Sequence, residues 1–250
     1  MRVRRRGLTG PCAAALLGLD GFRDLPWSPL WCVPITGESG DRIIRARDWQ
    51  EPVVIEGVPV CPVELVLRHL NAVPSELLGL PDGIDPSDRV ELALEHALRD
   101  GHKIAAPRGG SMPGDVMLRR LLRQRGDEPP TGSYAETRAL QLLRSWGVVP
   151  WRQVPVRRNG RIVNVADFML PFASRRRPEV FSPTDGVLLE VDSRQFHAEE
   201  FDHDSRRNSN YDGLSCHWVA ITANQIERQV EVVRRSIAGA FRRAGRPSPV

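Results

Sequence analysis

Three acidic residues of the C-terminal half lie in strand-like segments, at positions where apolar residues are expected. Asp167 lies within VNVADFML, and Glu190 and Asp192 lie within VLLEVD. Because side chains alternate across a β-strand, Glu190 and Asp192 share one face with Leu188. If the two strands pair so that Asp167 faces Glu190, like charges about 4 Å apart repel by roughly 4 kcal/mol at an effective dielectric near 20. Such an arrangement requires a cation or a proton.

A hard divalent cation, Mg²⁺ or Mn²⁺, is the simplest way to offset this repulsion, because carboxylate, carbonyl and water oxygens suit these ions. A metal ion would also supply what phosphodiester cleavage needs, an activated water and stabilised charge on the phosphate. The structural alternative is that each acid pairs with an arginine, such as Arg161 or Arg194, or lies in water at a strand end. This alternative stays open for each acid taken singly, whereas the triplet together favours a site.

Two further residues have both a structural and a functional interpretation. Glu136 follows Ser133 by three positions, which is the spacing of a capping box, and it is also an acid in the first turn of a helix. His197, five residues after Asp192, is suited to act as a general base, a metal ligand or a phosphate contact. A solvated or hydrogen-bonded histidine at a strand exit is the alternative.

The positive charge of the chain is concentrated in its C-terminal half. Residues 133–250 carry 18 basic and 13 acidic residues, whereas residues 1–132 carry 17 and 18. Lys103 is the sole lysine, so all C-terminal cations are arginines, whose planar fork suits phosphate. This favours an anionic partner, with nucleic acid first, and Arg194, Arg206 and Arg207 are candidate phosphate contacts. An arginine-biased composition on solvated faces is the alternative.

Length and composition indicate a globular protein with two domains. The 250 residues, 41% hydrophobic and 26% charged, exclude disordered and fibrous classes. The four cysteines, at positions 12, 32, 61 and 216, form no CxxC pair and are expected to be packed, reduced thiols. The N-terminus lacks a signal-peptide cleavage pattern, and no apolar run reaches bilayer length, so we expect a cytoplasmic protein without a membrane partner.

Secondary-structure patterns divide the chain at residues 125–132, RGDEPPTG, into domains 1–130 and 131–250. The first half predicts helices at 13–19, 62–70 and 87–101 and strand composition at 30–35, 41–46 and 52–60. The second predicts a helix at 133–148, a hairpin around Asn159-Gly160, a strand at 187–192, a helix around 199–212, a strand at 215–222 and a helix from about 224 to 244. The fold class expected is therefore α/β (α+β).

Five C-terminal segments resemble, in order and type, the Vsr-like (very short patch repair-like) endonuclease domains of the PD-(D/E)XK superfamily. They are GSYAETRALQLLRSWGV, VADFMLP, LLEVDSRQFH, FDHDSRRN and WVAIT, within residues 131 to 243. The resemblance implies a restriction-endonuclease-like core of helix, three strands, helix, strand and helix. The N-terminal segments GLTGPCAAALLGLDGF, VIEGVPVCPVELVLRHL and RVELALEHALRDG more loosely resemble the AbiEi-type antitoxin or regulator region, without its leading winged helix.

Carried over residue by residue, the resemblance implies that Asp167 and Glu190 bind the metal ion and that Glu136 completes or orients the site. Asp192 stands where the superfamily's general pattern has lysine, as it commonly does in the Vsr-like subgroup, and His197 matches that subgroup's histidine after the strand. Ala220 departs from the pattern, since these domains often have arginine there.

Two functions of different classes follow from these observations. The first is a metal-dependent DNA endonuclease acting in defence or repair, with RNA or mismatched DNA as other substrates that the sequence does not separate. The second is a non-catalytic DNA-binding or antitoxin-type regulator on a degenerate nuclease fold. The partners expected are DNA and, as further candidates, a second copy of the chain or a toxin or defence protein.

Overall fold

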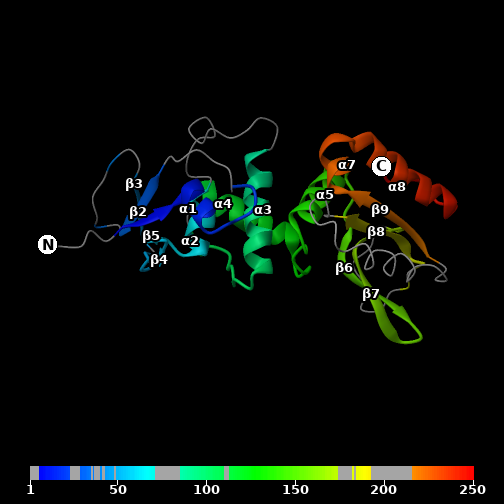
Figure 1. The fold of residues 1–250 in the computed structure, drawn as a ribbon, viewed down its shortest axis with the longest axis horizontal. Coiled ribbons are helices and arrows are strands. Elements are labelled where there is room, and N and C mark those ends of the chain that lie inside the picture. The colour runs from blue at the N-terminus through cyan, green and yellow to red at the C-terminus, as the bar shows by residue number, and fades with distance from the viewer. Residues whose placement is uncertain are drawn as a thin grey trace. The chain divides into compact units, whose positions relative to one another are not determined.

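Three clusters of buried apolar residues organise the chain, one in the unit Met1–Asp127 and two in the unit Glu128–Val250. Figure 1 shows the helices and strands of both units. The computed structural model describes residues 6–22, 29–34, 36, 40, 43–47, 49–70, 85–109, 113–173, 182, 184–192 and 216–250. Each unit combines helices with one mixed β-sheet, which agrees with the expected α/β class.

The first unit is a five-stranded sheet packed against helices. The strands lie in the order β3-β2-β1-β5-β4, and only the β1–β5 and β2–β3 pairs are parallel. Their bounds are β1 Gly7–Thr9, β2 Leu30–Pro34, β3 Ile43–Ala46, β4 Val53–Ile55 and β5 Val58–Val60. The helices are α1 Gly10–Leu16, α2 Val63–His69, α3 Pro86–Arg99 and α4 Pro113–Arg125. Their apolar faces form one core with the sheet, which includes Leu8, Val66 and Leu94.

Three elements of this unit differ from the sequence prediction. Strand β1 and helix α4 were not anticipated, and the stretch 52–60 forms a hairpin of β4 and β5 rather than one strand. Glu56 and Gly57 make its turn with φ values of 49° and 80°. Two consecutive positive φ angles match the tight turns that join antiparallel strands. A Glu-Gly pair is a weaker signal for such a turn than Asn-Gly, which explains the error.

The second unit is a four-stranded sheet in the order β6-β7-β8-β9 with helices packed on one face. Strands β6, β7 and β8 are antiparallel neighbours, and β9 runs parallel to β8. The bounds are α5 Tyr134–Ser145, β6 Trp151–Arg158, β7 Arg161–Pro171, β8 Gly186–Asp192, β9 His217–Thr222, α7 Ala223–Arg228 and α8 Val230–Arg243. The helix expected around 199–212 lies outside the described residues.

Strand β8 is buried along most of its length, and its side chains alternate between two cores as the sequence predicts. Val187, Leu189 and Val191 pack with the core that contains residues of α5 and α8. Leu188 packs on the other face, in a cluster with Trp151 of β6. Glu190 and Asp192 belong to the face of Leu188 by the alternation of the strand. The acidic pair therefore lies on the face opposite α5 and α8.

The last predicted helix is two helices, because the chain breaks at Gln229 with φ −134° and ψ 46°. Thr222 begins α7 with a capping box in which Gln225 is the reciprocal partner. The break allows Ile226 of α7 and Val233 of α8 to be buried in the same core.

No described helix has the length and apolar character required to span a bilayer. Cys12, Cys32 and Cys61 are buried, Cys216 is partly buried, and all four are free thiols.

Candidate functional site

The two principal candidate residues lie where the ladder between β7 and β8 stops. The last paired residues of this ladder are Phe168 and Leu189, and the next positions along the same register are Asp167 and Glu190. Both acids are buried, with exposed fractions of 5% for Asp167 and 8% for Glu190. The Asp167 carboxylate accepts a 2.7 Å hydrogen bond from the backbone N–H of Val191. The Asp167 side chain thus takes a backbone hydrogen-bonding position at the residue after Glu190, and the two acids occupy adjacent positions of neighbouring strands.

Glu190 is held from the same strand, β7, that carries Asp167. The amide Nδ2 of Asn164 donates to Glu190 Oε1 at 3.3 Å. On the other side of β8, Glu190 pairs with Ala220 of β9, and Asp192 pairs with Thr222. Ala220 and Asp192 are both exposed. The exposed Ala220, with its small side chain, is therefore the neighbour of the buried Glu190 across the β8–β9 pair.

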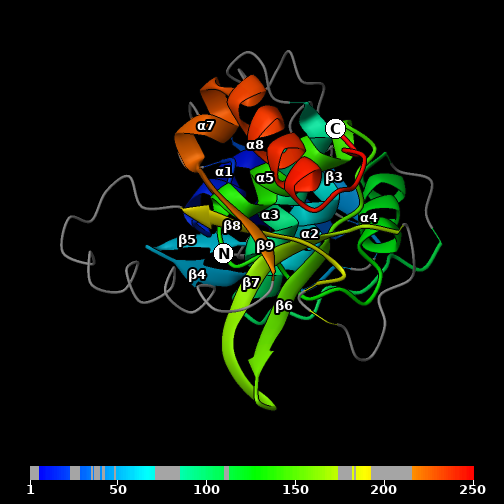
Figure 2. The same ribbon diagram turned by 90° about the vertical axis from the view of Figure 1, so that its right-hand side faces the viewer.

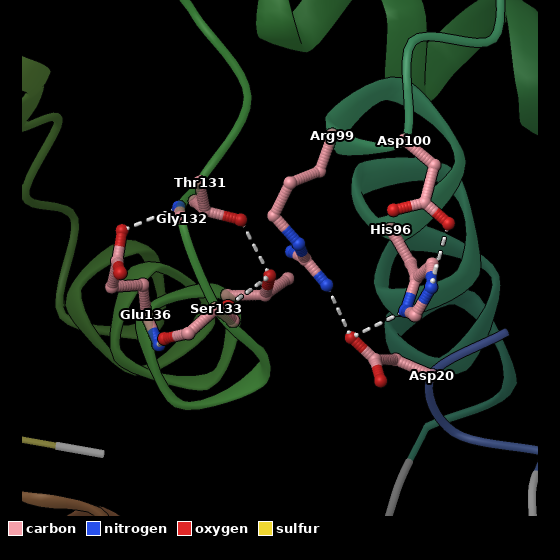
Figure 3. A network of polar contacts seen from close by, with 9 residues as sticks. Asp20, His96, Arg99, Asp100, Thr131, Gly132, Ser133 and Glu136 are labelled. Carbon is pink, nitrogen blue, oxygen red and sulfur yellow. Dashed lines mark hydrogen bonds and ion pairs between the residues drawn. The ribbon is translucent and has the colours of Figure 1, made fainter. Parts of the chain in front are cut away.

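Glu136 is positioned by the first turn of α5 and by the segment before it. Ser133 is the N-cap, and its hydroxyl accepts from the Glu136 N–H at 3.1 Å, as the capping pattern predicts. The carboxylate does not complete the box at Ser133; its Oε2 accepts from the N–H of Gly132 at 2.6 Å (Figure 3). A Cβ atom at Gly132 would lie 2.8 Å from Glu136 Oε1, so a side chain at this position would require the Glu136 carboxylate to shift.

Gln153 links Glu136 to the sheet, and no sequence pattern singled it out. Its amide Nε2 donates to Glu136 Oε2 at 2.8 Å. The neighbouring pairs Arg152↔Phe168 and Val154↔Ala166 place Gln153 opposite Asp167. Its backbone has a φ of 46°, in the left-handed region that residues other than glycine rarely adopt. Backbone strain of this kind concentrates at functional sites.

The β6–β7 pair is irregular at this point. Trp151 and Met169 form a pair whose side chains belong to one apolar cluster. Three residues further along each strand, Val154 and Ala166 pair and belong to the same cluster. Regular alternation would place them on opposite faces from Trp151 and Met169, so the Gln153–Asp167 position interrupts the alternation.

The donor set fits a hard divalent cation. Asp167 and Glu190 supply carboxylate oxygens, which Mg²⁺ and Mn²⁺ prefer. An ionised carboxylate offers about four lone-pair positions, so a hydrogen bond from Val191 or Asn164 is compatible with coordination. Within the described part of the chain, no group of three or more His, Cys, Asp or Glu side chains could hold a metal ion. Mg²⁺ is commonly bound by one or two carboxylates together with substrate phosphates and water.

The other candidates fall in two groups. Asp192 is described, at the exposed end of β8 on the face that Glu190 shares. The remaining candidates, the histidine after the strand and the three arginines predicted to contact phosphate, lie outside the described residues; these are His197, Arg194, Arg206 and Arg207.

The first unit contains a polar cluster that was not predicted from the sequence (Figure 3). The imidazole of His96 lies between two carboxylates, with Nδ1 3.1 Å from Asp20 and Nε2 3.1 Å from Asp100. Arg99 donates to Asp20 at 2.7 Å. His96, Arg99 and Asp100 lie three and four positions apart at the end of α3, a spacing that places side chains next to one another on a helix and can be recognised in the sequence. Asp20 follows α1 and reaches the cluster only through tertiary packing. The cluster connects the segment after α1 to the C-terminal turn of α3.

Comparison with known proteins gives no assignment. No protein-family model matches the chain, no curated protein matches it, and no solved structure matches it.

Proposed function

We propose that the chain is a metal-dependent DNA endonuclease that hydrolyses phosphodiester bonds. The observation that carries this proposal is the position of Asp167 and Glu190, two buried carboxylates on adjacent strands at the end of a shared ladder. Burying two like charges beside each other is unfavourable unless a cation or a proton accompanies them. A site of this kind is suited to a divalent ion and, with it, to phosphate chemistry.

The order of elements in the second unit supports the same proposal. Helix α5 is followed by three antiparallel strands, and the last strand, β9, lies parallel to β8. This order is consistent with the restriction-endonuclease-like core implied by the resemblance to Vsr-like domains. We propose that residues 131–250 are such a nuclease domain and that residues 1–130 form an AbiEi-like region.

Asp167 and Glu190 would hold Mg²⁺ or Mn²⁺ in this proposal. When bound, the ion supplies a water of lowered pKa and stabilises negative charge on the scissile phosphate. The protein's own contribution is to position the ligands. Val191 orients the Asp167 carboxylate through its backbone N–H, and Asn164 orients that of Glu190.

Glu136 acts in the proposed site as a positioning residue. Its carboxylate receives hydrogen bonds from Gly132 and Gln153, and Gln153 lies opposite Asp167 in the β6–β7 register. Glu136 thereby fixes Gln153 of β6, the residue next to the proposed metal ligand Asp167. Asp192, exposed on the same face as Glu190, is suited to hold or orient water at the end of β8.

Nicking of supercoiled plasmid by the full chain with Mg²⁺ or Mn²⁺ tests the proposal. We expect relaxation that EDTA abolishes and that the Asp167→Ala, Glu190→Ala double variant lowers by at least about a hundredfold, because removal of both ligands removes the ion. The matched control is Glu227→Ala, Glu231→Ala, which removes two exposed carboxylates from α7 and α8 and should leave nicking unchanged.

Two outcomes would contradict the proposal. Full nicking by the Asp167→Ala, Glu190→Ala variant would show that the activity resides elsewhere. Absence of nicking by the wild-type chain, with salt-sensitive DNA binding retained, would favour the regulator on a degenerate nuclease fold.

A further inference from the structure

The β6–β7 hairpin extends beyond the rest of its sheet. Strand β7 has 11 residues, yet its ladder with β8 begins only at Phe168. The distal part of the hairpin projects away from the other strands (Figure 1, Figure 2). Residues 157–162, which we name the arginine arm, are all exposed and turn through Asn159 and Gly160 at φ 51° and 76°.

The arginine arm gathers positive charge that its own fold does not require. Arg158 and Arg161 are direct cross-strand partners, and like charges in such pairs are destabilising. Arg157 donates to the carbonyl of Gly160 at 3.2 Å. The hairpin from residue 154 to residue 165 contains no acidic residue, and among the described residues no carboxylate forms an ion pair with these three arginines. An anionic partner would turn this unfavourable arrangement into a favourable one.

Apolar side chains accompany the arginines. Ile162 is 53% exposed and pairs with Arg157, and Val165 is 38% exposed further down the same strand. A surface that carries both guanidinium and apolar groups matches a nucleic-acid groove, where phosphates line the edges and base edges and thymine methyl groups form the floor.

The arm and the candidate metal ligand share strand β7. Arg161 precedes Asp167 by six residues, which corresponds to about 20 Å of extended strand. At about 3.4 Å per base pair this is about six base pairs of B-DNA. The major groove is wide enough to admit a two-stranded β-ribbon.

From this geometry we propose that the arginine arm enters the major groove of duplex DNA about six base pairs from the phosphate at the metal site that Asp167 and Glu190 would form. The inference rests on the proposed endonuclease function and names the element that holds its substrate. Arg157, Arg158 and Arg161 contact phosphates, and Ile162 contacts the groove floor.

Equilibrium binding in EDTA separates this inference from cleavage. The probe is a duplex of about three helical turns, titrated with full-length chain at several salt concentrations. We expect the Arg157→Ala, Arg158→Ala, Arg161→Ala variant to bind at least about tenfold more weakly, with a salt slope lowered by roughly 0.9 for each phosphate that it no longer neutralises. The Arg→Lys triple variant at the same positions retains the charge and should retain most of the slope.

The matched control removes three exposed arginines from α8, as Arg235→Ala, Arg242→Ala, Arg243→Ala. Equal losses of affinity for the arm and α8 variants would overturn the inference, since net charge alone would then explain binding. An unchanged affinity of the arm variant, or no duplex binding by the wild-type chain, would also overturn it. Plasmid nicking that depends on Asp167 and Glu190 would leave the endonuclease proposal standing in each of these cases.

Competition identifies the groove. Methyl green occupies the major groove. It should lower the affinity of the wild-type chain for the duplex to that of the arm variant, and it should leave the affinity of the arm variant unchanged. Competition by the minor-groove ligand netropsin alone would overturn the major-groove assignment. An A-form RNA duplex has a deep, narrow major groove, so equal arm-dependent binding of RNA would overturn it as well.

Discussion

Glu136 shows how one side chain serves both a helix and a candidate site. Its backbone N–H is capped by Ser133, which is a local feature of α5. Its carboxylate accepts from Gly132 and Gln153, which come from the segment before the helix and from β6. The carboxylate thus connects the helix to the strand position that faces Asp167. Charge and hydrogen bonding at this residue are separable by mutation.

Glutamine and alanine at position 136 should have different effects. Glu136→Gln keeps an oxygen that can accept from Gly132 and Gln153, so we expect the free energy of unfolding to change by less than about 0.5 kcal/mol. Glu136→Ala leaves both donors without this acceptor and should cost about 1–3 kcal/mol. If the negative charge contributes to the site, Glu136→Gln lowers nicking while its urea unfolding curve stays near that of the wild type. Equal destabilisation by both variants would contradict this separation.

Strand β7 is the element that unites the site and the arginine arm. Near its C-terminal end it is buried between β6 and β8, and near its start it is exposed in a two-stranded ribbon. The transition lies at the Gln153–Asp167 position, where the side-chain alternation of the β6–β7 pair is interrupted. The left-handed backbone of Gln153 is therefore part of how the hairpin presents Asp167 to β8.

Substitutions of Gln153 should report the cost of this backbone conformation. Gln153→Gly accepts a φ of 46° without steric cost, whereas Gln153→Val places a β-branched side chain in the left-handed region. Both variants lose the hydrogen bond to Glu136, so the difference between their free energies of unfolding reports the cost of the backbone conformation alone. We expect the valine variant to be less stable than the glycine variant by about 1–2 kcal/mol.

Hydrogen exchange of peptides from residues 151–171 measures this difference where it arises. Faster exchange in the valine variant than in the glycine variant is the expected result. The reverse order would show that Gln153 does not set the backbone conformation of the hairpin.

At the scale of the whole molecule, each unit has apolar cores of its own, so conditions that affect one unit need not affect the other. His69 gives the first unit a pH dependence. It is buried in α2, where its Nδ1 lies 2.9 Å from the Thr9 hydroxyl. Burial, together with the neighbouring positive charge of Arg68, lowers the pKa of His69 from 6.5 to about 4.

The first unit should lose stability as the pH falls from about 6.5 to about 4. In this window the unfolded chain binds a proton at His69 that the folded chain does not, so unfolding is favoured at low pH. The free energy of unfolding of this unit should fall by about 3 kcal/mol, with the full loss below pH 4 and no loss above pH 6.5.

Pulse proteolysis in urea, with fragment masses assigned to residues 1–127 or 128–250, measures this loss in the correct unit. The control is His69→Asn, which keeps a polar partner for Thr9 but does not titrate. An equally steep pH dependence in the asparagine variant would show that other groups cause it.

Features that depend on local periodicity could be predicted from the sequence. These include α5 with its Ser133 cap, the Asn159-Gly160 hairpin and the alternation of β8, because side-chain period and turn chemistry act over a few residues. The same alternation placed Glu190 and Asp192 on one face. Local patterns also explain the errors, since the Glu56-Gly57 turn and the break at Gln229 have no strong sequence signal.

Which residues meet depends instead on the tertiary structure. Gln153, Asn164 and Val191 contact the candidate acids through strand register and backbone conformation, and neither can be read from residue type. The projection of the arginine arm likewise follows from the unequal lengths of paired strands, which depend on where the β7–β8 ladder ends. Register and strand length are set by packing of the whole sheet, because long-range pairing is selected by burial on both faces rather than by any local segment.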